Sequence, residues 1–191
     1  YTPVEISRQA LLDSLHTLAS VVPEVEMLPV CADFTAPLVL PEPSRTPGRR
    51  LLFFPGSTLG NFDPAAAAAL LRSMAGLMQA QGLALVGIDL HQDPARIEAA
   101  YNDADGVTAA FTLNLLRRLN RELGSDFDLD GFAHRARYDR SAMRIQTDIV
   151  SLTCQQVRLG GQVFDFAAGD AIGVEYSHKY TRASLAALAA S

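Results

Sequence analysis

Three short segments of the sequence carry polar side chains suited to holding a small ligand. Gly56–Asn61 combines glycines, which let backbone approach a ligand closely, with an asparagine that offers a donor and an acceptor. Glu175 and Ser177 lie two residues apart in an alternating stretch, so both side chains point to one face of a strand. Such an acceptor and hydroxyl could hold a small ring with two nitrogens. Tyr101 ends a predicted helix, where its hydroxyl could face a ligand carboxylate.

Each segment also has a purely structural interpretation. Gly56–Asn61 could be an ordinary tight turn, since it lacks the terminal Lys-Ser/Thr of a phosphate-binding P-loop. Glu175 and Ser177 could lie at a solvent-facing strand edge, and Tyr101 could pack its ring at a helix end. Asp33-Phe34 follows a predicted strand, where a carboxylate and a ring suit a purine but also suit a helix cap and a core position. The residues alone leave these alternatives open.

The sequence contains no residue pattern that favours hydrolytic or metal chemistry. The 4 histidines pair with no serine or cysteine nucleophile at a telling spacing, so we expect no hydrolytic triad. Residues 126–131 copy the start of a calcium-binding loop, but Arg137 occupies the position where that loop needs a glutamate. We expect a polar turn there, with Asp130 capping the next helix, and no metal site.

The segments that must position these residues alternate between short strands and helices. Leu51–Phe54 and Leu83–Asp89 are typical of buried parallel strands, and Asp63-Pro64 begins a predicted helix from Ala65 to Ala80 between them. Ligands of open α/β sheets bind at the carboxyl ends of strands, which is where Gly56–Asn61 lies. We therefore predict a Rossmann-like, doubly wound α/β core.

Farther along the chain the pattern changes to α+β. Helices are predicted up to Tyr101 and from Val107 to Leu123. From Met143 the hydrophobic period is two, and residues 157–164 are typical of a hairpin with a Gly-Gly turn. We expect a parallel core over residues 1–91, an inserted α+β domain over 92–181, and the start of a helix that returns to the core over 182–191.

Composition excludes several classes of protein. Of the 191 residues 49% are hydrophobic, which supports a buried core and excludes a disordered chain. A net charge of -5 leaves nothing to neutralise phosphates, so we expect neither nucleic acid nor an anionic membrane surface as a partner. Cys31 and Cys154 lie far apart without a Cys/His cluster, which indicates a reducing compartment. We expect a cytoplasmic monomer that binds a small molecule.

Taken together, these segments resemble the family of histidine-specific methyltransferases that use S-adenosylmethionine (SAM). The resemblance runs along nearly the whole chain, and its most specific blocks are residues 54–61 and 101–124. Shorter blocks lie at residues 1–7, 31–34, 87–90 and 175–179. The resemblance implies methyl transfer to the α-amino nitrogen of histidine, which forms trimethylhistidine on the way to ergothioneine.

The resemblance also implies that the core over residues 1–91 binds SAM, that the inserted domain over 92–181 binds the substrate, and that particular residues contact the amino acid. Asn61 and Tyr101 match residues that position the carboxylate and amino end of the amino acid. Glu175 and Ser177 match the pair that grips the imidazole, and Tyr176 between them is assigned to the substrate as well. None of these residues is expected to act as a catalytic acid or base.

For the cofactor, the resemblance implies that Asp33 and Phe34 contact the adenine of SAM. Glu5 falls where the family usually has an aspartate that holds the ribose hydroxyls. One departure concerns substrate fit, since residues 144–147 read Arg-Ile-Gln-Thr where relatives often carry Arg-Ile-Glu-Met, with the methionine near the imidazole.

The family's glycine-rich cofactor loop should precede Tyr1, and further strands should follow Ser191. We therefore expect the sequence to be a piece of a longer protein. Two alternatives to histidine methylation stay open. One is the same reaction on another amino acid, such as a tryptophan derivative, and the other is a non-catalytic ligand-binding module.

Overall fold

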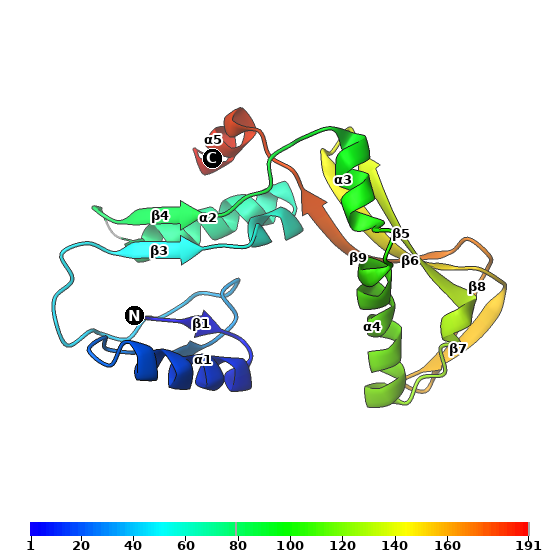
Figure 1. Ribbon diagram of the computed structural model, residues 1–191, viewed down its shortest axis with the longest axis horizontal. Coiled ribbons are helices and arrows are strands. Elements are labelled where there is room, and N and C mark those ends of the chain that lie inside the picture. The colour runs from blue at the N-terminus through cyan, green and yellow to red at the C-terminus, as the bar shows by residue number, and fades with distance from the viewer. Residues whose placement is uncertain (79, 191) are drawn as a thin grey trace. The chain divides into compact units, whose positions relative to one another are not determined.

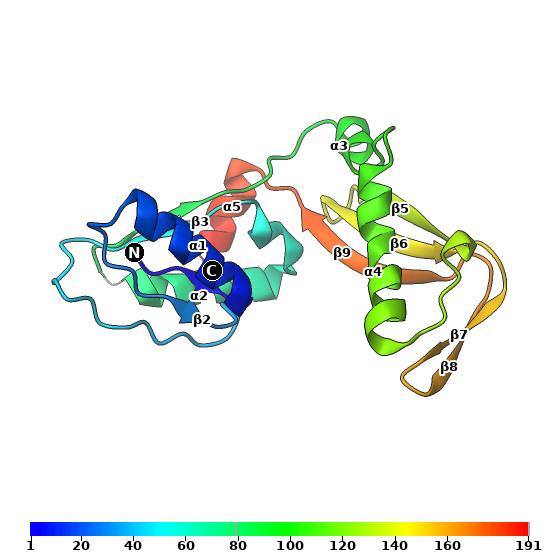
Figure 2. The same ribbon diagram turned by 60° about the horizontal axis from the view of Figure 1, so that its bottom comes forward.

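The computed structural model describes residues 1–78 and 80–190, and they form two compact units. Unit 1 comprises Tyr1–Phe53 and Ala69–Leu85, and unit 2 comprises Phe54–Ala68 and Val86–Ser191. Figures 1 and 2 draw the elements of both units. Among the described residues, no helix combines the length and the apolar character that a membrane span requires. The predicted domain limits at residues 91 and 181 stay a prediction.

A strand–helix–strand segment opens unit 1. Strand β1 (Val4–Glu5) pairs in parallel with β2 (Val30–Cys31), and α1 (Arg8–Val21) connects them. The helix begins at Ser7, whose hydroxyl accepts a hydrogen bond from the amide of Ala10. The pairing extends one step before the two strands, since Leu28 N donates to Tyr1 O at 2.8 Å and Val30 N donates to Pro3 O at 2.9 Å.

A second strand–helix–strand segment follows with β3 (Leu51–Phe54), α2 (Pro64–Met78) and β4 (Leu83–Val86). Leu83 N donates to Arg50 O and Gly87 N donates to Phe54 O, so the strands advance together as a parallel pair (Figure 1). The predicted cap of α2 is confirmed, since an Asp63 carboxylate oxygen accepts from Ala66 N at 2.8 Å.

These two segments confirm the predicted α/β architecture, with differences at the ends of its elements. In the described residues the four parallel strands pair two by two, β1 with β2 and β3 with β4. The predicted helix to Ala80 ends at Met78, and Gln79 lies outside the described residues. The predicted strand to Asp89 ends at Val86, because the Asp89 amide donates to the Ser57 hydroxyl at 2.8 Å instead of to a strand.

The main body of unit 2 is an antiparallel sheet with the strand order β5–β6–β9. Its strands are β5 (Phe132–Asp139), β6 (Arg144–Ser151) and β9 (Ala171–His178). Helices α3 (Pro94–Tyr101) and α4 (Val107–Leu123) pack against β5 (Figures 1 and 2). Both helices were predicted at these positions, and Gly124 ends α4 in the left-handed conformation that favours glycine.

Two clusters of apolar side chains connect these helices to the sheet. The cluster with α4 consists of Leu116, Phe127, Phe132, Ile149 and Val157, and the smaller one with α3 consists of Ile97, Ala136 and Ile145. The predicted period of two in β6 is confirmed, since Ile145 and Ile149 are fully buried. Met143, predicted on the same face, lies in the turn before β6 with a positive φ of 48°.

The remaining elements of unit 2 are short. Strands β7 (Gln155–Leu159) and β8 (Gln162–Phe166) form the predicted hairpin, and the positive φ angles of Gly160 and Gly161 explain the two glycines in its turn. The predicted cap at Asp130 is wrong. Asp128 caps instead, accepting from Asp130 N at 3.2 Å across the 3-10 turn η2 (Leu129–Gly131), and the element that follows is strand β5. Helix α5 (Arg182–Ala189) ends the described chain.

Strand β9 contains a β-bulge that controls where its side chains point. Thr147 of β6 pairs with Glu175, whereas Asp148 pairs with Gly173, so Val174 is an extra residue on β9. Val174 packs against the apolar cluster of α4. Paired residues share a face, so Glu175 beside the buried Thr147 lies on this core-facing side as well.

Candidate functional site

The turn after β3 packs against the end of β9. This turn is the 3-10 segment η1 (Thr58–Asn61). Its Gly60 lies so close to β9 that a Cβ placed on it would be 2.8 Å from the carbonyl oxygen of His178. Asn61, the next residue, is therefore held beside the end of β9 that carries Ser177. The Asn61 side chain is exposed and has no hydrogen-bond partner in the described part of the chain.

The segment after β4 joins the same place. Tyr180 N donates to Asp89 O at 2.9 Å, and His91 N donates to Tyr180 O at 2.8 Å. The bond from the Asp89 amide to the Ser57 hydroxyl ties this segment to the turn after β3. Three segments that follow strands β3, β4 and β9 thus converge, and their convergence places the Asp89 carboxylate next to Lys179.

A buried ammonium group lies at this convergence. Lys179 Nζ donates to Asp89 Oδ2 at 2.7 Å, to the Tyr101 hydroxyl at 2.8 Å and to Ser177 Oγ at 2.8 Å. The two hydroxyls also hydrogen bond to each other at 2.9 Å. Lys179 and Ser177 are buried, whereas the Asp89 side chain is 54% exposed. The cluster therefore contains a buried cation whose counter-charge still reaches solvent.

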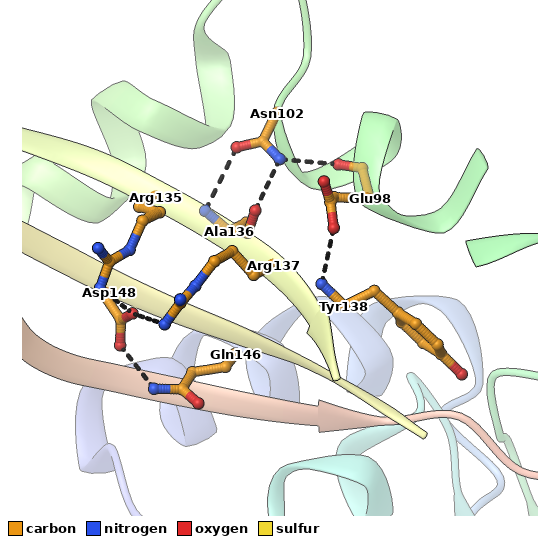
Figure 3. Close-up of polar contacts among 8 residues, drawn as sticks. All are labelled: Glu98, Asn102, Arg135, Ala136, Arg137, Tyr138, Gln146 and Asp148. Carbon is orange, nitrogen blue, oxygen red and sulfur yellow. Dashed lines mark hydrogen bonds and ion pairs between the residues drawn. The ribbon is translucent and has the colours of Figure 1, made fainter. Parts of the chain in front are cut away.

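Two polar side chains near the end of α3 fasten this helix to the free edge of β5 (Figure 3). The Asn102 amide donates to Ala136 O at 3.0 Å and accepts from Ala136 N at 3.3 Å. One step along the strand, the Glu98 carboxylate accepts from Tyr138 N at 2.8 Å. These bonds satisfy edge groups that a further strand would otherwise pair with. They fix Tyr101, the last residue of α3, against the sheet.

Tyr101 is held from a second direction. His134 on β5 donates from Nε2 to the Tyr101 carbonyl oxygen at 2.8 Å. The Tyr101 ring also packs against the apolar cluster of Ile97, Ala136 and Ile145. The structural interpretation of Tyr101, a ring packed at a helix end, is therefore correct, and it also delivers the hydroxyl to Ser177.

Glu175 lies one row farther along β9 and carries a free carboxylate. Its side chain is exposed and has no hydrogen-bond or ion-pair partner among the described residues. It pairs across the sheet with Thr147, which is 2% exposed and whose hydroxyl is buried without a hydrogen-bond partner. The next row pairs Ser177 with Ile145, so the predicted common face of Glu175 and Ser177 is present.

Tyr176 lies on the opposite face of the same strand. It pairs with Gln146, and its ring packs against the Arg144 guanidinium, whose central carbon is 3.7 Å from the ring centroid. The side chain therefore points away from Ser177 and Glu175, and its assignment to the substrate stays a prediction.

The face that carries Tyr176 is organised around a buried carboxylate (Figure 3). Asp148 is 1% exposed and forms ion pairs with Arg135 at 2.9 Å and Arg137 at 3.5 Å, and it accepts from Gln146 at 3.0 Å. Burial raises the pKa of Asp148, but the hydrogen bonds from Gln146 and Arg135 and the charges of both arginines outweigh it, so the pKa lies below its usual value. Both carboxylate oxygens of Asp148 accept from side chains of the protein, so this residue has a structural role.

The predicted cofactor residues lie in unit 1. Parallel pairing of β1 and β2 puts Glu5 and Asp33 at the carboxyl ends of neighbouring strands. Hydrogen bonds from the side chain and amide of Thr35 to Asp33 Oδ1 lower the pKa of Asp33. Glu5 uses one oxygen to accept from Ser7 N at 2.7 Å. Each carboxylate keeps a second oxygen for the hydroxyls or the amino group of a nucleoside, and Phe34, which is half-buried, follows directly.

Within unit 2 a hydrogen bond joins Tyr101 to Ser177, Glu175 lies one row away on β9, and the turn that carries Asn61 packs against His178. Asp89 and Lys179 were not predicted as site residues, although both lie in blocks that carry the family resemblance. One signal was present for the lysine, since it continues the alternation of Glu175 and Ser177 by one further step. No local pattern assigns Asp89 a role in the site, because its partner lies 90 residues away.

Comparison with known proteins identifies the family. Residues 1–191 match the family described as histidine-specific methyltransferase, SAM-dependent. A histidine N-alpha-methyltransferase from Mycolicibacterium smegmatis is 38% identical over 184 residues, which cover 94% of this chain and 56% of that protein. The enzyme of the same name from Mycobacterium tuberculosis is 38% identical over 182 residues, with the same coverage of both chains. The chain thus spans about half the length of these relatives.

Two further similarities are weaker. Ergothioneine biosynthesis protein 1 of Neurospora crassa is 38% identical over 76 residues, which cover 40% of this chain and 9% of that protein. A solved SAM-dependent methyltransferase from Clostridium acetobutylicum aligns with a TM-score of 0.46 at 11% identity, over 99% of this chain and 61% of that one. The match over the full length decides the assignment: the chain belongs to the family of SAM-dependent, histidine-specific methyltransferases.

Proposed function

We propose that the intact protein transfers methyl groups from SAM to the α-amino nitrogen of L-histidine. The observation that carries this proposal is the free Glu175 carboxylate next to the Ser177 hydroxyl on one face of β9. The two relatives that share 38% identity with the chain and bear the name histidine N-alpha-methyltransferase support the same reaction.

The proposed contact with the ring explains why histidine is preferred. An imidazole carries two nitrogens, so it can use an anionic acceptor and a hydroxyl at once, whereas an indole offers a single donor. In this proposal Glu175 accepts from one ring nitrogen and Ser177 contacts the other. Asn61 and Tyr101 bind the carboxylate and amino end of the same molecule, with Tyr176 assigned to the substrate through its position on the strand.

A second candidate substrate is an amino acid with a larger ring, such as a tryptophan derivative. The observation that favours it is Thr147, which pairs with Glu175 and is smaller than the methionine that relatives often carry there. A smaller side chain leaves more room for a ring. Glu175 argues against it, because one of its oxygens would face an apolar part of an indole and lose its hydration without compensation.

The residues of unit 1 fit the nucleoside part of SAM. Asp33 and Glu5 each retain a carboxylate oxygen that can accept from the adenine amino group or the ribose hydroxyls, and Phe34 offers a ring for stacking. When bound, SAM supplies an electrophilic methyl group. The protein's own task is to orient the substrate amine with its lone pair toward that methyl, at about 3–3.5 Å. Contacts at the remote imidazole hold this geometry, so their loss should lower turnover as well as affinity.

The setting that we propose for the enzyme is a cytoplasmic monomer without a nucleic-acid partner. Cys31 and Cys154 are both exposed free thiols, which is typical of a reducing compartment. The net charge of -5 disfavours binding to phosphate backbones.

The experiment is to incubate the full-length protein with SAM and a panel of amino acids and to read the product masses. Histidine should gain methyl groups. Glu175→Ala should sharply lower its turnover, while Glu122→Ala, which removes an exposed carboxylate on α4, should leave it unchanged. Calorimetry should show that Asn61→Ala weakens histidine binding more than SAM binding. Methylation of tryptophan but not histidine would favour the second substrate, and a panel without any product would leave a non-catalytic ligand-binding module.

A further inference from the structure

Lys179 is the only lysine in a chain that contains 16 lysine and arginine residues. Its side chain is 3% exposed, so this one ammonium group is also a buried one. The other lysine or arginine positions of the sequence, including all the exposed ones, are arginines. The single position that uses lysine is the one where a cation must contact several acceptors in a confined space.

The geometry explains this choice of residue. An ammonium group has three N–H donors, and Lys179 directs them to Asp89 Oδ2, the Tyr101 hydroxyl and Ser177 Oγ at 2.7 to 2.8 Å. A guanidinium is planar and larger, so it cannot direct donors at three acceptors grouped around one point. The donors of Lys179 are therefore fully used by the protein, and none is left for a ligand.

Counting hydroxyl protons gives a further consequence. Tyr101 and Ser177 each accept from Lys179, and the 2.9 Å bond between them uses one of their two protons. One proton remains for a ligand, and it belongs to whichever hydroxyl accepts in the mutual bond. The pair therefore acts as one unit with a single outward donor, although the two residues match opposite ends of the proposed substrate.

We propose that Lys179 is a positioning residue of the substrate site, which fixes Tyr101 and Ser177 as acceptors and leaves them one shared proton for the amino acid. The inference rests on the proposed function, since it concerns how the same site recognises histidine. Asp89 completes the arrangement by balancing the buried charge from a side chain that is half exposed.

The test compares Lys179→Met and Lys179→Arg with the wild type in the full-length protein. Both variants should lower kcat/KM for histidine by about ten- to a hundredfold, the usual effect of losing a hydrogen bond to a charged group. The dissociation constant of SAM should stay unchanged. Arg158→Met is the matched control, because it removes an exposed cation on β7 whose side chain is 77% exposed, and its kinetics should equal those of the wild type.

A second arm separates positioning from a merely structural role. If Lys179 acts through the two hydroxyls, Lys179→Met should cause no additional loss of kcat/KM in a protein that already carries Tyr101→Phe and Ser177→Ala. If Lys179→Met fails to fold, Asp89→Asn provides the test, because it keeps the size of the half-exposed side chain and should lower kcat/KM in the same direction.

The outcomes are distinct. A folded Lys179→Met protein with unchanged kcat and KM overturns the inference, as does an equal loss in the presence and absence of the two hydroxyls. A wild-type protein that methylates another amino acid refutes only the proposed substrate, and the same ratios measured with that amino acid still decide the role of Lys179.

Discussion

Replacing Gly60 by alanine should move the turn that carries Asn61 away from β9. The added Cβ would lie 2.8 Å from the His178 carbonyl oxygen and 3.3 Å from the His178 nitrogen, whereas ordinary contacts begin at 3.4 Å. Both neighbours are backbone atoms within a strand that is paired on one side, so the turn must yield by about 0.6 Å. Overpacking of this kind costs about 1–3 kcal/mol of stability.

The same displacement should weaken the proposed site. Binding constellations tolerate errors of about 0.5 Å, and a misplacement of 1 Å costs about a hundredfold in rate, so a shift of this size should lower kcat/KM for histidine by about tenfold. Urea unfolding and steady-state kinetics of the full-length protein measure the two effects. Gly76→Ala is the control, since no atom lies within 4 Å of the added Cβ in helix α2, and it should stabilise by roughly 0.5–1 kcal/mol.

Two results would refute this reasoning. A Gly60→Ala protein as stable as the wild type would mean that the turn does not pack against β9 as described. A destabilised protein with unchanged histidine kinetics would mean that the packing exists but that Asn61 does not contribute to the site.

Two further predictions concern stability. Asp148→Ala should lose about 1.5–3 kcal/mol of stability, because it removes the buried acceptor of Arg135, Arg137 and Gln146. Arg137→Met, at a side chain that is 58% exposed, should cost under about 1 kcal/mol, and equal urea midpoints for both variants would show that the ion pairs contribute nothing specific. Hydrogen bonds from Thr108 and Val107 lower the pKa of Asp103 from 3.8 to about 2, so its contribution is complete above pH 3.8 and disappears as the pH falls toward 2. Asp103→Asn should therefore be less stable than the wild type at pH 7 and equal to it near pH 2, and a difference that grows on acidification would contradict this sign.

Much of the fold could be predicted because local signals decide it. Asp63-Pro64 and Gly124 mark helix ends through their own hydrogen bonding and backbone conformation, and Gly160-Gly161 specifies a hairpin turn. The common face of Glu175 and Ser177 follows from alternation alone. These features depend on residues within one turn or one strand.

The parts that could not be predicted depend on partners far apart in the sequence. The strand at residues 83–86 ends because the Asp89 amide donates a hydrogen bond to the hydroxyl of Ser57, which lies 32 residues earlier in the sequence. Lys179 becomes the centre of the site only because β9 returns to Asp89 and Tyr101, 90 and 78 residues away. Asp128 replaces Asp130 as the cap because the following segment pairs as a strand, which is decided by the partner strand rather than by the turn.

The extra residue in β9 determines which deletions in this strand the site should tolerate. Before Val174 the core-facing residue Ile172 has an even number, and after it Glu175 and Ser177 have odd numbers on the same face. The extra residue therefore shifts the alternation of side chains by one position. Deletion of Val174 alone should keep Glu175 opposite Thr147 and Ser177 opposite Ile145, because it removes only the residue that has no partner on β6. Deletion of Tyr176 would instead put Glu175 and Ser177 on opposite faces of the strand, so it should damage recognition far more.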